Sequence, residues 1–181
     1  DLEEVIKEAR KRLEDSHRRL EKLIREVEKE HEDSHRKLRE LVERVKKKHK
    51  EVEEKIKRNG VSEKDLKRIE DNIRKSEKEL RDALKRHKEN VDRSRKKLED
   101  ILRRHRKKLE EVERKLEEMR RKGSPVEELL KDLERMVREL NEEIERALED
   151  AKRNVDRLDD EIRKLEERVD RNVKRLEEDI K

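Results

Sequence analysis

The chain has 181 residues, of which 61% are charged and 27% hydrophobic; its formal net charge is +5, and it contains no Phe, Tyr, Trp or Cys. A chain without Cys has no thiolate metal site, and one without aromatic side chains has no stacking platform for single-stranded nucleic acid. Two glycines are too few for a phosphate-binding loop, and no apolar run is long enough to span a membrane. We therefore expect no enzyme, no cofactor, no small-molecule substrate, and no nucleic-acid or membrane partner; with no signal peptide, the chain should be soluble and cytoplasmic when expressed.

The first predicted helix spans about residues 1–58, because Leu, Ile and Val recur there at helical spacing. Gly60 suits the left-handed position that follows a helix. Ser62 suits an N-cap, and Asp65, three residues later, completes a capping-box pattern. This combination of a stop and a start predicts a second helix over about 62–122.

A second break of the same kind follows at Gly123. Ser124 suits an N-cap and Pro125 the first helical position, which predicts a third helix over about 125–181. Connections this short make neighbouring helices antiparallel. The fold class expected is therefore all-α: a single-chain, antiparallel, up-down-up three-helix bundle that forms one domain over residues 1–181.

An 18-residue repeat runs through all three predicted helices. In the first helix Glu14–Leu20 recurs as Glu32–Leu38, and the other two helices repeat their polar core positions at the same interval. Eighteen residues make five turns at 3.6 residues per turn, so a stripe with this period stays on one face of a straight helix. We expect a long and nearly untwisted bundle.

The apolar residues of each predicted helix occupy one arc of about 120° on a helical wheel, as a closed three-helix core requires. No second apolar stripe is left for a further obligate interface. The three helices carry net charges of +3, +8 and −6. Opposite charge on the second and third helices favours their pairing, as the flanking charges of a coiled coil do.

Polar residues interrupt these apolar arcs. All six histidines of the chain fall on core-facing or core-edge positions, accompanied by Ser and Asn. A neutral imidazole has one donor and one acceptor, and an Asn amide has both, so these residues can satisfy one another inside a core. The predicted network histidines are His17, His31, His35, His49, His87 and His105, and their predicted partners are Ser16, Ser34, Asn72, Ser76, Asn90, Ser94, Asn154 and Asn172.

The two breaks also predict which residues lie at the same height along the helices. Residue numbers should sum to about 120 between the first and second helices and to about 247 between the second and third. Four polar layers follow from this register. The predicted layers are His17 with His105, His35 with His87, His31 with Asn90 and Asn154, and His49 with Asn72 and Asn172.

Three interpretations of these layers are open. Buried His and Asn in helical bundles set register and orientation and need no further role. The layers can also act as a proton-sensitive switch, because histidine changes charge near neutral pH. The third interpretation is a metal site, since His31 and His35 lie one turn apart with His87 opposite. The paired Glu-x-x-His pattern of a di-iron bundle is incomplete, because Glu28 precedes His31 but Leu84 stands at the matching position before His87. Our expectation is that no metal binds.

The chain resembles de novo designed helical bundles with buried hydrogen-bond networks. The resemblance rests on the repeat, on the capping-box breaks and on a surface composed almost entirely of Glu, Asp, Lys and Arg. Designed bundles rich in buried histidine include pH-responsive bundles and subunits of filaments that come apart in acid. The resemblance covers the whole chain. It implies a synthetic structural protein without natural activity or location, whose stability or assembly depends on pH and whose partner is a second copy in a homo-oligomer or filament.

Overall fold

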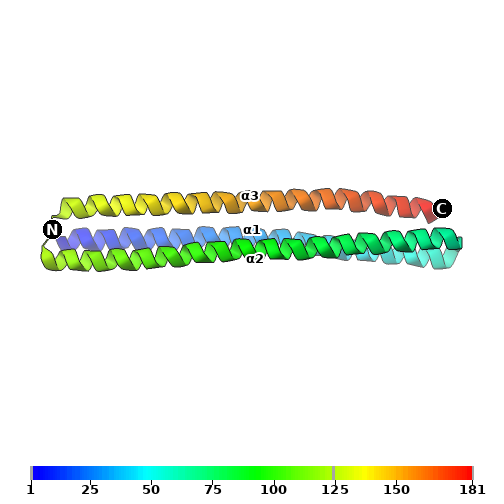
Figure 1. The fold of residues 1–181 in the computed structure, drawn as a ribbon, viewed down its shortest axis with the longest axis horizontal. Coiled ribbons are helices and arrows are strands. Elements are labelled where there is room, and N and C mark those ends of the chain that lie inside the picture. The colour runs from blue at the N-terminus through cyan, green and yellow to red at the C-terminus, as the bar shows by residue number, and fades with distance from the viewer. Residues whose placement is uncertain (1, 124, 181) are drawn as a thin grey trace. The chain divides into compact units, whose positions relative to one another are not determined.

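The computed structural model describes residues 2–123 and 125–180. Within this part of the chain three α-helices follow one another, α1 (Leu2–Asn59), α2 (Glu63–Lys122) and α3 (Val126–Ile180), and there is no strand (Figure 1). Segments of all three helices pack on one another around shared apolar clusters. The predicted all-α three-helix bundle is confirmed.

The connection between α1 and α2 has the predicted geometry. Gly60 adopts a φ of +69°, and its N–H donates to the carbonyl of Ile56 at 3.0 Å, closing the last turn of α1. The N–H of Asp65 donates to Ser62 Oγ at 3.3 Å, and the N–H of Leu66 donates to the Ser62 carbonyl at 2.9 Å. Ser62 is therefore the N-cap of α2, as predicted.

The connection between α2 and α3 follows the same pattern where it is described. Gly123 has a φ of +64°, and its N–H donates to the Met119 carbonyl at 3.0 Å. The N-cap predicted at Ser124 lies outside the described residues. Pro125, predicted as the first helical residue, stands directly before α3, which begins at Val126. A difference of one residue at a helix end is within the usual fraying of helix boundaries.

The contacts divide the chain into two compact units, and each unit contains a segment of all three helices. The first unit consists of Asp1–Lys29 and Arg93–Arg153, and the second of Glu30–Asp92 and Asn154–Lys181. Each has its own buried apolar clusters, centred in the first unit on Leu20 and Leu98 and in the second on Leu38 and Leu80. That one nearly untwisted bundle extends over residues 1–181 stays a prediction.

Ion pairs between α2 and α3 show the pairing of these helices inside each unit. In the first unit Arg104 Nη1 lies 3.6 Å from Glu143 Oε1, and in the second Arg168 Nη1 lies 3.0 Å from Glu79 Oε1. The residue numbers of both pairs sum to 247, the predicted register of two antiparallel helices. Because these side chains are exposed, the ion pairs orient the helices more than they stabilise them.

Most large hydrophobic side chains of the described residues are buried or half-buried. Leu130, with 36% of its surface exposed, is the large hydrophobic residue that stands out to solvent among the described residues. No stretch of the helices described here combines the length and the apolarity that crossing a bilayer requires.

Replacing Gly60 by Ala tests the left-handed ending of α1. A Cβ at this position meets no atom within 4 Å, so the cost comes from the backbone conformation alone. We expect Gly60→Ala to lower the free energy of unfolding by about 1 to 2 kcal/mol, measured by urea denaturation. Gly60→Asn should cost less, because Asn tolerates this conformation better. Equal stability of the Gly60→Ala variant and the parent chain would contradict the assigned geometry.

Candidate functional site

In the first unit, His17 and His105 form a nitrogen-to-nitrogen contact between α1 and α2. Their Nδ1 atoms are 3.0 Å apart, while the ring centroids are 5.1 Å apart and the ring planes differ by only 15°. Since the nitrogens are much closer than the centroids, the rings approach each other through their Nδ1 edges, with nearly parallel planes. This is the geometry of an N–H···N hydrogen bond, in which one ring donates and the other accepts.

Glu21 determines which ring donates. His17 is half-buried, and its Nε2 lies 3.0 Å from Glu21 Oε1, one turn further along α1. A carboxylate only accepts, so the neutral His17 ring donates from Nε2 and accepts at Nδ1 from His105. Arg106 Nε also lies 3.5 Å from His17 Nε2, at the limit of a hydrogen bond, and the shorter contact to Glu21 prevails.

Charges around this pair act on both of its ends. Arg106 Nη2 donates to Glu21 Oε1 at 3.2 Å, and this hydrogen bond is the main reason why the pKa of Glu21 lies below its usual value. Partial desolvation opposes this lowering, and the charge of His17 adds to it. His105 is only 3% exposed. Burial, with smaller contributions from the charges of His17 and Lys108, lowers the pKa of His105 from 6.5 to about 4. His105 is therefore neutral at pH 7.

The second unit contains an equivalent pair, His35 and His87. Their Nδ1 atoms are also 3.0 Å apart, with centroids 5.1 Å apart and ring planes differing by 29°. The other nitrogen of His87, Nε2, lies 3.1 Å from Ser34 Oγ, and Ser34 is 1% exposed. Both nitrogens of His87 thus have partners, and the predicted layer of His35 with His87 is present together with its predicted Ser.

Desolvation dominates the electrostatics of this second pair. Burial, aided by the charges of His35 and His31 and opposed by the carboxylate of Asp159, lowers the pKa of His87 from 6.5 to about 4. These three groups face His87 from α1 and α3. The pKa values thus favour neutral rings in the pair.

His35 has its own charged neighbours. Burial lowers the pKa of His35, the cations of Arg39 and Lys88 add to this, and Asp92 opposes it. Arg39 stands one turn after His35, where the first pair has Glu21 one turn after His17. The two pairs share one geometry in different electrostatic surroundings.

The layer of His31, Asn90 and Asn154 is also present in the second unit. Asn154 Nδ2 donates to Asn90 Oδ1 at 2.7 Å and lies 3.3 Å from His31 Nε2. His31 is 2% exposed, while Arg157 Nη2 donates to Asn154 Oδ1 at 2.8 Å from the solvent side. One Asn side chain from α3 therefore connects α1 with α2, as the register predicted.

The predicted layer of His49 with Asn72 and Asn172 is different. His49 Nδ1 lies 3.3 Å from Glu77 Oε1, and His49 Nε2 is buried without a hydrogen-bond partner. Both Asn side chains are half-buried, and neither forms a hydrogen bond with another described residue. A carboxylate is a stronger acceptor than an amide, so Glu77 takes the proton-bearing nitrogen, while the Asn side chains keep access to solvent.

The remaining predicted partners are less involved. Ser16 donates to Asn141 Oδ1 at 3.4 Å, although its repeat equivalent Ser34 contacts a histidine. Ser76 and Ser94 are half-buried and make no hydrogen bond among the described residues. The sequence analysis did not predict Glu21 and Glu77 as partners of His17 and His49. Glu21 could have been predicted, because it lies one helical turn after His17.

The metal interpretation has little geometric support. In the described part of the chain no group of three or more His, Cys, Asp or Glu side chains could hold a metal ion. Of the three histidines considered from sequence, His87 turns its two nitrogens to Ser34 and to His35, and His31 turns Nε2 to Asn154. Their donor atoms do not converge on one point, as a tetrahedral site requires.

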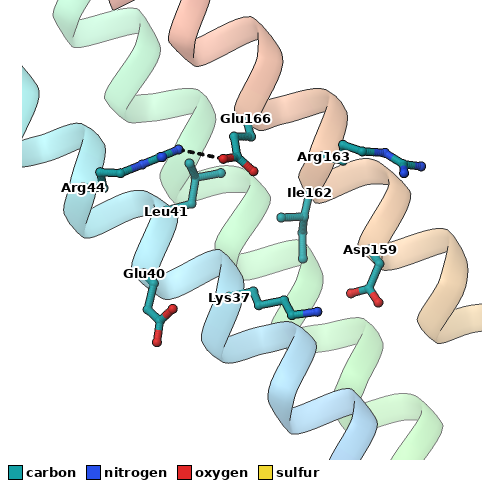
Figure 2. A pocket seen from close by; sticks show the side chains of 8 residues that line it. All are labelled: Lys37, Glu40, Leu41, Arg44, Asp159, Ile162, Arg163 and Glu166. Carbon is teal, nitrogen blue, oxygen red and sulfur yellow. Dashed lines mark hydrogen bonds and ion pairs between the residues drawn. The ribbon is translucent and has the colours of Figure 1, made fainter.

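A hollow on the surface of the second unit lies between α1 and α3. Its lining combines three basic and three acidic side chains with two apolar ones, and Arg44 Nη2 lies 3.0 Å from Glu166 Oε1 across it (Figure 2). A lining with balanced charge selects no charged ligand. The hollow matters to the network through Asp159, which lines it and whose carboxylate partly opposes the lowering of the His87 pKa by burial.

Comparisons with protein-family models, with curated proteins and with solved structures find no match to this chain. Function must therefore be argued from the histidine geometry itself.

The repeat-equivalent residues His31 and His49 allow a matched test of the unpartnered nitrogen. Replacing His49 by Leu removes a buried polar atom that has no partner, and Glu77, whose side chain is 38% exposed, stays hydrated. We expect His49→Leu to raise the free energy of unfolding by about 1 kcal/mol at pH 7.5. His31→Leu should lower it by about 1 kcal/mol, because Asn154 loses an acceptor. Urea denaturation of both variants checks the pair, and equal changes would contradict the assignment.

Proposed function

We propose that the chain is a designed structural protein, a three-helix bundle that is stable at neutral pH and destabilised by acid. The observation that carries the proposal is the Nδ1-to-Nδ1 contact of 3.0 Å, present once in each unit between a buried and a half-buried ring. The rings face each other rather than a cavity, which favours a structural role over catalysis. The 18-residue repeat and the capped connections support an origin by design.

Protonation breaks such a pair for two reasons. A doubly protonated imidazole has no acceptor, so two charged rings place N–H against N–H. Burial also disfavours the charged form, as the lowered pKa of about 4 for His87 and His105 indicates. Both rings of a pair can therefore become protonated only after the hydrogen bond between them has broken.

The direction of the pH dependence follows from the lowered pKa values. In the unfolded chain His87 and His105 bind protons at a pKa of 6.5, and in the folded chain only near 4, so the unfolded state holds more protons at these two residues between those values. Stability is thus fully present above about pH 6.5 and falls as the pH approaches about 4. His87 and His105 each contribute about 3 kcal/mol over this range.

Register-setting alone is the alternative, and it predicts no special acid sensitivity. The discriminating variant replaces the four histidines of the two pairs by Asn, since an Asn pair keeps a donor and an acceptor but does not titrate. We expect the parent to lose about 6 kcal/mol of unfolding free energy between pH 7.5 and pH 4, measured by urea denaturation with circular dichroism. The variant should lose less than half of that amount. The residues replaced are His17, His35, His87 and His105.

If parent and variant lose stability equally, exposed carboxylates are responsible and the pH proposal is wrong. Light scattering over the same pH range measures self-association in the same samples. Scattering that rises at neutral pH and disappears in acid would extend the proposal to a homo-oligomer or filament. Unchanged monomeric scattering would restrict it to the stability of the single chain.

A further inference from the structure

Each histidine pair places two nitrogen donors opposite each other across a helix interface. In both pairs the Nδ1 atoms are 3.0 Å apart and the ring centroids 5.1 Å apart, so the two rings approach each other through their Nδ1 edges. Zinc requires three or four donors, and no such group exists among the residues described. Two opposed donors are the coordination that monovalent d10 cations accept.

We propose that His17 with His105, and His35 with His87, are two-coordinate sites for a soft monovalent cation, Cu(I) or Ag(I). Imidazole nitrogen is a suitable ligand for copper, and two neutral donors leave a buried charge of only +1 for the surroundings to balance. A divalent ion between the same donors would bury twice that charge. The inference does not rest on the pH response, which concerns protons at the same atoms.

Contacts to the outer nitrogens prepare the rings for this role. Glu21 lies 3.0 Å from His17 Nε2, and Ser34 Oγ lies 3.1 Å from His87 Nε2. A carboxylate on the far nitrogen of a ligating histidine orients the ring and fixes its tautomer, whereas a hydroxyl, which can donate or accept, orients the ring only. In each pair the ring that accepts the N–H···N bond already has its lone pair at Nδ1.

The other ring of each pair must change tautomer. The proton on its Nδ1 moves to Nε2 of the same ring, and both Nδ1 lone pairs then bind the cation. No proton leaves the protein and no electron is transferred in this step. Silver binding at pH 7.5 should therefore release the same heat in buffers of different ionisation enthalpy.

The rings must also separate slightly. Metal–imidazole bonds are about 2 Å long, so the two Nδ1 atoms need to lie about 4 Å apart. In each pair one ring is buried and its partner, His17 or His35, is half-buried at the rim of the core. The half-buried ring can retreat toward solvent by the required distance, and it also provides the path by which the ion enters.

Two thioethers compete for the same ions. Met119 and Met136 are half-buried in the first unit, and thioether sulfur is a preferred ligand of Cu(I). The experiment therefore starts from the Met119→Leu, Met136→Leu chain, a change of nearly equal volume that a core tolerates. Circular dichroism at pH 7.5 verifies that this chain and each variant below are folded.

The test is calorimetric titration with silver nitrate in chloride-free buffer at pH 7.5, with zinc nitrate in parallel. We expect two silver ions per chain, one in the His17→Asn or His35→Asn variant and none in the double variant. The matched controls His31→Asn and His49→Asn should retain both sites. Imidazole ¹⁵N spectra of the starting chain should show silver-induced shifts at the Nδ1 atoms of the paired histidines alone.

Other outcomes overturn the proposal. Silver binding that persists in the double variant, or that is lost with His31 or His49, would place the ion elsewhere. Heats that depend on the buffer would show proton displacement and contradict the tautomer step. A tight zinc site lost in His35→Leu would replace the two-donor geometry with a three-histidine site. Absence of silver binding in a chain with an intact acid response would overturn this inference and leave the proposed function standing.

Discussion

A hydrogen bond between a buried and a half-buried imidazole exists only while one of the two facing nitrogens can accept a proton, and this constraint governs the architecture. The bond of 3.0 Å connects α1 to α2 in each unit, so helix register is tied to the protonation of two rings. Burial of His87 and His105 to 5% and 3% exposure excludes the water that would otherwise replace the bond. The hydrogen bond between the rings therefore requires both a fixed register of α1 and α2 and the exclusion of water.

The repeat places one geometry in two electrostatic settings. One turn after the first paired histidine of α1 stands Glu21, and one turn after the second stands Arg39. Glu21 accepts from the ring beside it, whereas the cation of Arg39 lowers the pKa of His35. The two layers share the Nδ1-to-Nδ1 hydrogen bond but differ in the charged groups beside it, because the surface residues around them do not repeat.

The sequence was sufficient to predict the three-helix fold and three of the four polar layers, but only three of the eight predicted Ser and Asn partners take part in those layers. The helix breaks at Gly60 and Gly123 determine the helix lengths and therefore the register. This is why His17 could be paired with His105, and His35 with His87, from the sequence. The partner of His49 was not predictable in the same way. Its position on the helical wheel predicted hydrogen bonds to the Asn side chains of α2 and α3. In the structure the ring instead contacts the carboxylate of Glu77, which lies at the edge of the core. Rotamers of long, half-buried side chains are decided by local competition, which residue spacing does not encode.

The division into two units has a consequence for how the chain folds. Each unit contains one short connection, so each has a hairpin of two consecutive helical segments, residues 30–92 around Gly60 and residues 93–153 around Gly123. The two helical segments of such a hairpin lose little loop entropy when they come into contact, so we expect their contacts to form early in folding. The third segment of each unit, residues 1–29 or 154–180, comes from far along the chain and joins later. Folding therefore has two independent local starting points, and a slow docking step is confined to the two terminal segments.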